Sequence, residues 1–217
     1  MAQCGNALGL FSYLGKTMLT TKDIINAMLV ANGETPVTSP DSQHPSVLSA
    51  LEVLNRINTE FQAQAWWFNT DYALELSPNE ATGEVIVPSN TLMVELTSSL
   101  PYVWRGSKLY DPVKHTYNIG SKVTVNLVTK LDIEELPTVA ALYVQAKAVQ
   151  THYIGDDGDM DKASKYEAET LKAWAMVQKD ERRITKQNAT NSPTAFAILS
   201  RIQLGGSSYN PNYPGGR

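Results

Sequence analysis

Hydrophobic residues recur every three or four positions in four segments of the chain, and this spacing predicts four amphipathic helices. Two of these segments precede residue 67 and two follow residue 136. The helices are expected at residues 20–32, from Pro45 to about Trp66, from Pro137 to near Tyr153, and from about Lys162 to Lys186.

Each predicted helix has an apolar stripe that is expected to face a common core. In the first helix, which Thr20 or Thr21 can cap and Gly33 can end, the stripe is Ile24, Ile25, Met28 and Leu29. In the second it is Val47, Leu51, Leu54, Ile57, Phe61 and Ala65, with Asn55, Arg56, Asn58, Thr59, Gln62 and Gln64 opposite. In the third it is Val139, Leu142, Tyr143, Ala146 and Val149, and in the fourth Tyr166, Leu171, Trp174, Val177 and Ile184.

Between residues 68 and 136 the apolar period shortens to two, which is typical of strands. Short strands are expected around Tyr72–Leu76, 85–87, 92–96 and 121–130. A hairpin is expected at residues 104–110, with its turn at Arg105-Gly106-Ser107 and a break at Asp111-Pro112. Frequent turn residues between short strands favour an antiparallel sheet.

The order of these elements predicts an α+β fold: a helical bundle formed by N-terminal and C-terminal helices, with a small antiparallel β domain inserted between them. We divide the chain into an N-terminal helical part (1–67), an antiparallel β part (68–136), a C-terminal helical part of the same bundle (137–187) and an extended tail (188–217).

The net charge of −4 is distributed unevenly along the chain. From residue 185 to the last residue there are three basic residues and no acidic one, so this tail carries +3 and the rest of the chain −7. An acidic body argues against general nucleic-acid binding, and a basic tail dotted with apolar residues indicates an arm that docks on another protein. No apolar run approaches the ~18 residues of a membrane span, the N-terminus lacks the basic start of a signal peptide, and a single cysteine, Cys4, fits a reducing cytoplasm.

The sequence displays no catalytic, cofactor-binding or metal-binding constellation. The three histidines, His44, His115 and His152, are isolated from one another. The acidic stretch Asp156–Asp161 fails the EF-hand spacing, so we interpret it as a loop before a helix N-terminus, with a weak divalent-cation site as the alternative. Glu134 and Glu135 are adjacent, whereas a glycosidase needs two carboxylates facing one cleft.

Three large aromatic residues stand together in the stretch "AQAWWFNT" (63–70), where the helical period gives way to the strand period. A membrane wedge or a nucleic-acid stacking platform would need basic neighbours, and only Arg56 is near. We therefore expect Trp66, Trp67 and Phe68 to join the second helix to the sheet, with at least one indole packed on the sheet. One of them could instead contact a neighbouring subunit.

Five segments, in order, resemble the tail tubular protein A family of short-tailed podovirus bacteriophages. They are "AMLVANGETPVTS" (27–39), "VLSALEVLNRINTEFQAQAWWFNTDY" (47–72), "GSKLYDPVKHTY" (106–117), "VTVNLVTKLDIEELP" (123–137) and "HYIGDD" (152–157). The resemblance covers roughly residues 20–185. The first 18 residues and the end of the chain after Leu204 match no pattern of that family.

The resemblance implies a structural virion protein, the adaptor or gatekeeper of the neck, rather than an enzyme. Such proteins form a ring of about twelve copies between the portal protein and the tail nozzle protein (tail tubular protein B type). Genomic DNA passes through the lumen without specific binding, and the C-terminal tail reaches the portal. The expected location is the virion tail, and the host cytoplasm before assembly. The alternatives are an adaptor that also degrades peptidoglycan and, less favoured, a non-viral helical scaffold.

For the portal contact we select the apolar residues that flank one arginine in the otherwise polar tail, because such a group suits an interface hot spot. These residues are Phe196, Ile198, Leu199, Arg201 and Ile202.

Overall fold

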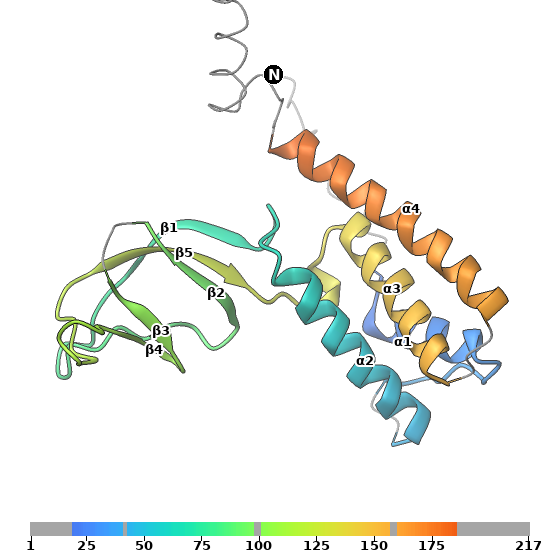
Figure 1. The fold of residues 1–217 in the computed structure, drawn as a ribbon. Coiled ribbons are helices and arrows are strands. Elements are labelled where there is room, and N and C mark those ends of the chain that lie inside the picture. The colour runs from blue at the N-terminus through green and yellow to red at the C-terminus, as the bar shows by residue number, and fades with distance from the viewer. Residues whose placement is uncertain (1–18, 41–42, 98–100, 157–159, 186–217) are drawn as a thin grey trace, which may run out of the picture. The chain divides into compact units, whose positions relative to one another are not determined.

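The computed structural model describes residues 19–40, 43–97, 101–156 and 160–185, which fold into helices and small antiparallel sheets (Figure 1). The predicted α+β class is therefore confirmed. The elements are α1 (Thr21–Ala31), α2 (Pro45–Gln62), β1 (Thr70–Leu76), β2 (Thr91–Leu96), β3 (Val103–Arg105), β4 (Lys108–Tyr110), β5 (Val123–Thr129), the 3-10 helix η1 (Ile133–Glu135), α3 (Thr138–Asp156) and α4 (Met160–Ile184). The boundary between two compact units of the chain falls within α4, between Val177 and Gln178.

Helix α1 follows the sequence prediction closely. Thr20 caps it reciprocally: the Thr20 hydroxyl accepts from the Asp23 backbone N–H, and the Asp23 carboxylate accepts from the Thr20 backbone. This capping box satisfies N–H groups that a helix N-terminus otherwise leaves without partners. All four residues of the predicted stripe are buried, and Gly33 adopts the left-handed φ of +80° just after the helix, where glycine is favoured.

Helix α2 begins at Pro45 as predicted but ends at Gln62, four residues before the predicted end at Trp66. The reason is local: Ala65 has a positive φ of 61°, which no helix interior allows. Two residues assigned to the polar face, Asn58 and Gln62, are buried, with exposed fractions of 4% and 0%. That assignment was wrong, because both amides are satisfied within the protein.

Helix α3 buries only part of the predicted stripe: Val149 is buried, and Val139 and Tyr143 pack against the core while staying partly exposed. Its fully buried residues include Ala140, Val144 and Ala148, whereas Leu142 of the predicted stripe is 41% exposed. The helix is apolar on most of its circumference, so the sequence gives no single stripe. It needs this composition because α1 and α2 contact it, and α4 contacts it through ring pairs such as Tyr143–Trp174.

Helix α4 packs through Tyr166, Trp174 and Val177, as predicted, but not through Leu171 or Ile184, the second of which is 46% exposed. Leu171 is 60% exposed, while its neighbour Thr170 is buried. One residue turns a helix by 100°, so Leu171 lies off the face that carries Thr170 and Trp174. The Thr170 hydroxyl can be buried there because it donates to the Tyr166 carbonyl at 2.9 Å.

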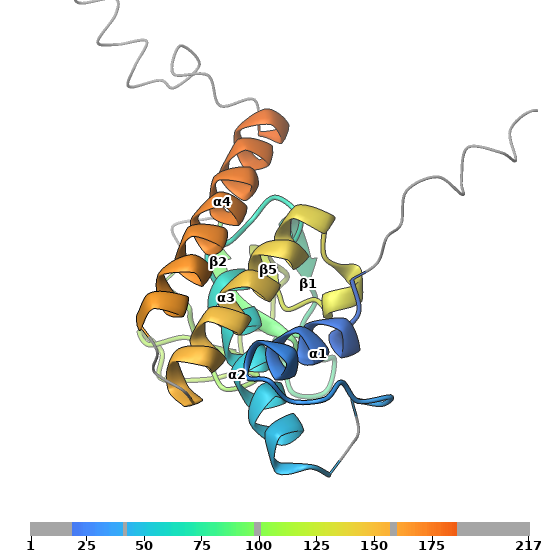
Figure 2. The same ribbon diagram turned by 90° about the vertical axis from the view of Figure 1, so that its right-hand side faces the viewer.

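In Figure 2, α3 lies beside both α1 and α4. The four helices and η1 contribute to one hydrophobic cluster, which we call the helical core. Among the described residues, eighteen hydrophobic side chains are buried in it. They come from all four helices, from η1 and its C-cap residue, and from Trp66. The closure of these helices into the predicted bundle stays a prediction.

The β strands form a three-stranded antiparallel sheet in the order β1-β5-β2 and a separate β3-β4 hairpin. The hairpin closes as expected at Gly106, whose φ is +59°, with Arg105 paired to Lys108. The predicted strand at 85–87 is instead a set of isolated bridges, Pro78↔Val85 and Ile86↔Lys108. Val85 and Val87 are nevertheless buried. Both side chains belong to the hydrophobic cluster of the strand region, although their backbone is not part of a strand.

Strand β1 interrupts the predicted alternation. Its register with β5 shifts between Asp71 and Leu74, where Ala73 has a φ of +54°. The Asn126 side chain stabilises this bulge, because its Oδ1 accepts from the Ala73 N–H at 3.0 Å. A bulge redirects the side chains beside it, and Tyr72 is accordingly 72% exposed.

A second, smaller hydrophobic cluster, which we call the β core, lies within the strand region. Its buried residues in the described part are Leu76, Val85, Val87, Leu109, Val123, Val125 and Leu127. The helical core and the β core thus form separate clusters. The predicted domain limits stay predictions, and the tail after residue 187 lies outside the described residues.

Candidate functional site

The junction between α2 and β1 is a tight turn built from the stretch "AQAWWFNT". After the reversal at Ala65, the Trp66 backbone N–H donates to Asn69 Oδ1 at 2.9 Å. The Trp66 carbonyl accepts from the Thr70 hydroxyl at 2.8 Å. These bonds replace the helical hydrogen bonds that end at Gln62, so the chain leaves α2 with its buried backbone groups satisfied.

The aromatic residues of the turn belong to the helical core. Trp66 is 7% exposed and its indole N–H donates to the Phe61 carbonyl at 2.7 Å. Its ring lies 4.9 Å from Phe61 and 5.5 Å from Trp174, between centroids, in tilted and edge-on geometries that aromatic pairs favour. Trp67 and Phe68 are half-buried and also pack on the helical core. Both indoles are assigned to the helical core, and the expectation that one of them also packs on the sheet stays a prediction.

The buried side-chain amide of Gln62 connects helix α2 to the segment that follows β5. Gln62 Nε2 donates to the Leu131 carbonyl at 2.8 Å, and Gln62 Oε1 accepts from the Leu131 N–H at 2.8 Å. The same Nε2 lies 2.8 Å from Asn58 Oδ1, and Asn58 Nδ2 reaches the Leu131 carbonyl at 3.3 Å. One side chain thus binds both backbone groups of a residue far away in sequence, as a neighbouring strand would.

Asn69 joins the two chain segments that connect helices and sheet. Its Nδ2 donates to the Gln62 carbonyl at 2.9 Å and to the Thr129 carbonyl at 3.1 Å. The Thr129 N–H donates in turn to the Asn69 carbonyl at 2.8 Å. Sequence reasoning identified the junction but missed Asn58, Gln62 and Asn69. A signal was present in the spacing, because Asn58 and Gln62 stand four residues apart on one helix face.

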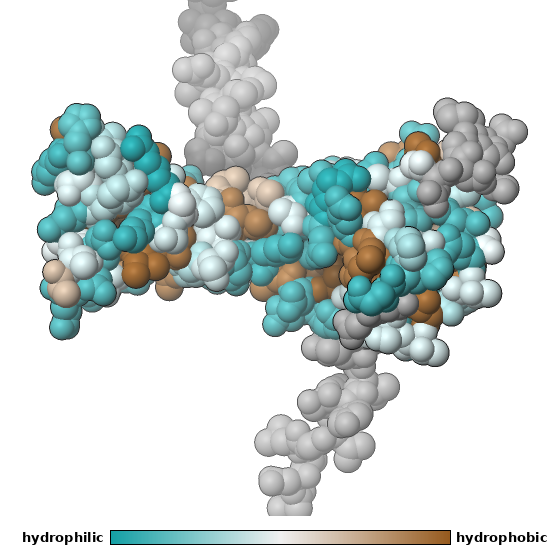
Figure 3. All heavy atoms as spheres, turned by 90° about the horizontal axis from the view of Figure 1, so that it is seen from below, coloured by the Kyte–Doolittle hydropathy of each residue, from teal (hydrophilic) through white to brown (hydrophobic). Residues whose placement is uncertain are grey.

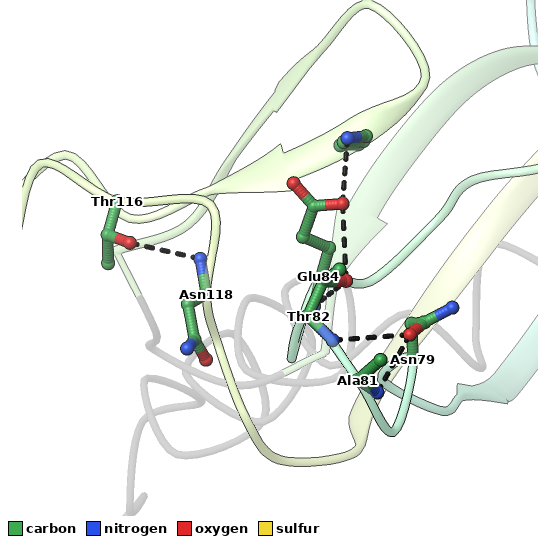
Figure 4. A network of polar contacts seen from close by, with 7 residues as sticks. Asn79, Ala81, Thr82, Glu84, Thr116 and Asn118 are labelled. Carbon is green, nitrogen blue, oxygen red and sulfur yellow. Dashed lines mark hydrogen bonds and ion pairs between the residues drawn. The ribbon is translucent and has the colours of Figure 1, made fainter.

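The loops of the β part are held by polar contacts (Figure 4). Asn79 Oδ1 accepts from the backbone N–H groups of Ala81 and Thr82, at 2.9 and 3.2 Å. The Glu84 carboxylate accepts from Lys108 Nζ at 2.7 Å, and this hydrogen bond holds the pKa of Glu84 below its usual value. Across the same turn, a Cβ on Gly83 would overlap the Asn118 side-chain amide, which would have to move, and the φ of +69° itself favours glycine.

The adjacent acids Glu134 and Glu135 both act as backbone caps. Glu134 Oε1 accepts from the Thr21 N–H at 2.7 Å, and Glu135 Oε2 from the Asp132 N–H at 3.3 Å. Burial alone would raise the pKa of Glu134, but the hydrogen bonds from Thr21 outweigh it and lower the pKa. Both carboxylates thus accept hydrogen bonds from backbone N–H groups at helix N-termini, which is a structural role.

Three surface pockets in the described part lack paired carboxylates. Three pockets in the described part are lined by one acidic residue each, Glu169, Glu167 and Glu60 respectively. General acid–base hydrolysis of a glycosidic bond requires two carboxylates across one cleft. These pockets therefore do not provide that arrangement.

The histidines are apart from one another. His152 is buried and its Nδ1 lies 3.1 Å from Asn32 Nδ2, whereas His115 is in a β loop 3.5 Å from the Tyr110 hydroxyl. Within the described ranges, no three His, Cys, Asp or Glu side chains could hold a metal ion together. Residues 157–159 of the acidic stretch lie outside those ranges. In the same part of the chain, no helix is long and apolar enough to cross a membrane.

Comparison with known proteins places these features in a family. The sequence pattern of a family described as tail tubular protein matches residues 22–185. This range includes all the described strands and helices except the first residue of α1. A match over this much of the chain shows that the protein belongs to the tail tubular protein family, whose members are structural proteins of bacteriophage tails.

A curated relative extends the match. The chain is 31% identical over 176 residues to the Tail tubular protein A of Klebsiella phage KP34. The aligned region covers 81% of this chain and 92% of that protein. The family indicated by the five sequence segments is thereby confirmed, and the protein is a component of a virion tail.

Proposed function

We propose that the protein is the head-to-tail adaptor of its virion. In this role it forms a ring, of about twelve copies, between the portal protein and the tail nozzle protein. Genomic DNA passes through the lumen without specific binding, and the free protein resides in the host cytoplasm before assembly. The supporting finding is membership of the tail tubular protein family over residues 22–185.

The observation that carries this proposal is the presence of two separate hydrophobic cores joined by a hydrogen-bonded junction. One chain of this design can offer two independent surfaces to two partners. Large exposed apolar residues occur in both regions, with Tyr72, Ile86 and Val113 in the β region and Leu171 and Met176 on α4. Figure 3 shows such apolar surface over both regions. Exposed apolar groups of this kind mark interaction surfaces.

For the contact between subunits we select Trp67. Of the two indoles, Trp66 is buried and hydrogen-bonded, whereas Trp67 is half-buried and stands edge-on to Trp66 and Phe68. A partly exposed indole held rigidly by neighbouring rings is a suitable hot spot. We expect Trp67→Ala to fold normally and to lose ring formation with portal in negative-stain images. Normal rings from this variant would refute the assignment.

For the portal contact we propose the tail residues Phe196, Ile198, Leu199, Arg201 and Ile202, which lie outside the described residues. A chain truncated after Gln187 should keep its helical circular dichroism signal and lose portal binding in co-sedimentation. A matched truncation after Leu204 keeps all five residues and should bind as the full chain does. Portal binding with wild-type affinity by the chain truncated after Gln187 would contradict the proposal.

Charge supports passage of DNA without retention. Residues 1–184 carry −7, and a lumen of that sign repels phosphate rather than holding it. We expect the full chain to show no measurable DNA binding at physiological salt in a mobility assay. A tight, salt-dependent complex would count against an acidic lumen.

The peptidoglycan-degrading alternative is not proposed, because nothing described favours it. The adjacent pair Glu134 and Glu135 acts in caps, and three pockets of the described part offer one carboxylate each.

A further inference from the structure

An apolar groove of about 570 Å³ runs between α1, α3 and α4. Large side chains on its walls are half-exposed: Val30 at 55%, Leu142 at 41% and Met176 at 54%. Between these walls, each helix contributes small residues to the lining, among them Ala27, Ala146 and Ala173. Three half-exposed hydrophobic residues around one hollow are a typical sign of an occupied surface.

The groove results from the way α4 rests on α3. Two aromatic pairs hold the helices apart at the ends of their contact: Tyr143–Trp174, with ring centroids 5.0 Å apart, and Tyr153–Tyr166, at 5.2 Å. Between these pairs the facing residues are small, such as Ala146 and Ala173. Large spacers at both ends and alanine between them leave room for an additional apolar segment.

The sequence before α1 has the pattern that such a groove accepts. Ala7, Leu10, Phe11 and Leu14 stand at the spacing i, i+3, i+4, i+7, by which an amphipathic helix is recognised in an apolar groove. At helical spacing, the residues opposite this stripe are Gly9, Ser12 and Lys16. Gly15 follows the stripe directly, at a position where glycine favours a helix end.

We propose that residues 7–14 of the same chain occupy this groove, lying alongside α1. The connection is short enough to favour the same chain: seven residues from Leu14 to Thr21 reach at most about 24 Å when extended. Ala27 and Ala31 of the groove lie only about 9 and 15 Å along α1 from Thr21. Leu19 already packs on the helical core, so the chain enters α1 beside the same cluster.

The lengths of segment and groove also agree. Eight residues of helix measure about 12 Å, and the α3 wall from Leu142 to Val149 measures about 10 Å at the same rise per residue. Helix, turn and helix in this order form an antiparallel helical hairpin, whose loops have about two to five residues. Gly15 to Leu19 would supply that loop. The proposal concerns the isolated chain and is independent of the portal.

Crosslinking of the full chain tests the position of the segment. With Cys4 replaced by serine, Tyr13→Cys is combined with either Glu169→Cys or Glu167→Cys. Glu169 lines the groove, whereas Glu167 lines a pocket on another side of α4. A short bismaleimide should link Tyr13→Cys to Glu169→Cys within one chain at least about fivefold faster than to Glu167→Cys, because the local concentration differs.

Mass spectrometry of the product decides between the outcomes. A link within one chain at Glu169→Cys supports the proposal. Equal rates at both positions, no link at either, or links only between chains would overturn it. The last result would assign the groove to a neighbouring copy.

A thermal measurement keeps the proposal testable without crosslinks. Phe11→Ser should lower the melting temperature by roughly 4 °C, because a buried apolar ring is lost. Tyr13→Ser, which removes an aromatic ring outside the stripe, should leave it unchanged. Equal effects of the two variants would overturn the proposal. So would a larger decrease on truncation after Gln187, since the tail would then be the occupant.

Discussion

The helical core and the β core bury their apolar side chains in different ways. In the described part, the helical core has eighteen buried hydrophobic residues, and its rings contact one another from Phe61 to Trp174. The β core has seven, all of them valine or leucine. Its loops depend instead on polar contacts such as Glu84–Lys108 and on the close approach of Gly83 to Asn118. The smaller β core is therefore expected to depend more on the hydrogen bonds and backbone conformations of its turns for stability than the helical core does.

The largest effect is expected from Phe61→Ala in the helical core. Phe61 is 2% exposed and contacts the rings of Trp66, Phe68 and Tyr143. Loss of its ring leaves a cavity, so the free energy of unfolding should fall by about 3–5 kcal/mol in urea denaturation. The control Leu171→Ala, at a 60% exposed position, should change it by less than about 0.5 kcal/mol. Similar values for both would contradict the core assignment.

Gly83→Ala should weaken the β region selectively. The new methyl group would meet the Asn118 side chain, and the positive φ adds strain, so we expect about 1–3 kcal/mol of local destabilisation. Gly106→Ala is the matched control, because it has a similar φ and nothing within 4 Å of its added Cβ. Hydrogen exchange should accelerate at residues 78–120 while the helices stay protected. Uniform acceleration would show that the two cores unfold together.

Gln62→Ala tests the junction between the two regions. It leaves the N–H and carbonyl of Leu131 without the Gln62 partner, at a cost of about 1–3 kcal/mol in the free energy of unfolding. The exposed Gln64→Ala is the control and should be neutral. If both are neutral, Gln62 does not stabilise the junction.

Ala65→Gly should stabilise the protein. Ala65 has a φ of 61°, a conformation that glycine adopts without the steric cost of a side chain. The expected gain is about 0.5–1 kcal/mol, seen as a higher midpoint of denaturation. The same change at Ala63, whose φ is −64°, should bring no gain. Destabilisation by Ala65→Gly would mean that the methyl group itself is needed.

The smallest effect is expected from Glu134→Gln, and it should depend on pH. The pKa of Glu134 is lower in the folded protein than the ordinary 4.5. Its contribution is therefore complete above pH 4.5 and is lost as the pH falls through the folded pKa. The variant should be less stable than the wild type at pH 7, and this difference should shrink below pH 4.5. A constant difference across that range would exclude the carboxylate charge as its cause.

The sequence predicted best where one apolar stripe faced one partner. Helix α1 is such a case, since Ile24, Ile25, Met28 and Leu29 all lie on one side and are all buried. For helix α3 the predicted stripe was only partly right, because the helix has partners on several sides and its apolar residues do not form a single stripe. Val85 and Val87 show a third case: their alternation indicated burial correctly, but periodicity cannot distinguish a ladder strand from isolated bridges.

The junction was predicted by position but not by its chemistry. The change of period at residues 66–68 located it, yet its polar connections come from Gln62 and Asn69. Local rules assign amides to exposed faces because a buried polar group needs partners. Here the partners, Leu131 and Thr129, stand more than fifty residues away in sequence, so no local pattern could reveal them.

The hydrogen bond between Asn69 and Thr129 has a further consequence. The chain enters the β region at Asn69 and leaves it at Thr129, and the carbonyl of the first lies 2.8 Å from the N–H of the second. The two ends of the insertion therefore meet, and a short turn could join them directly. Replacing the whole β region would leave the ends of the helical region at their native separation. Evolution could thus exchange one such insertion for another, changing what this end of the molecule binds while keeping the same helical frame.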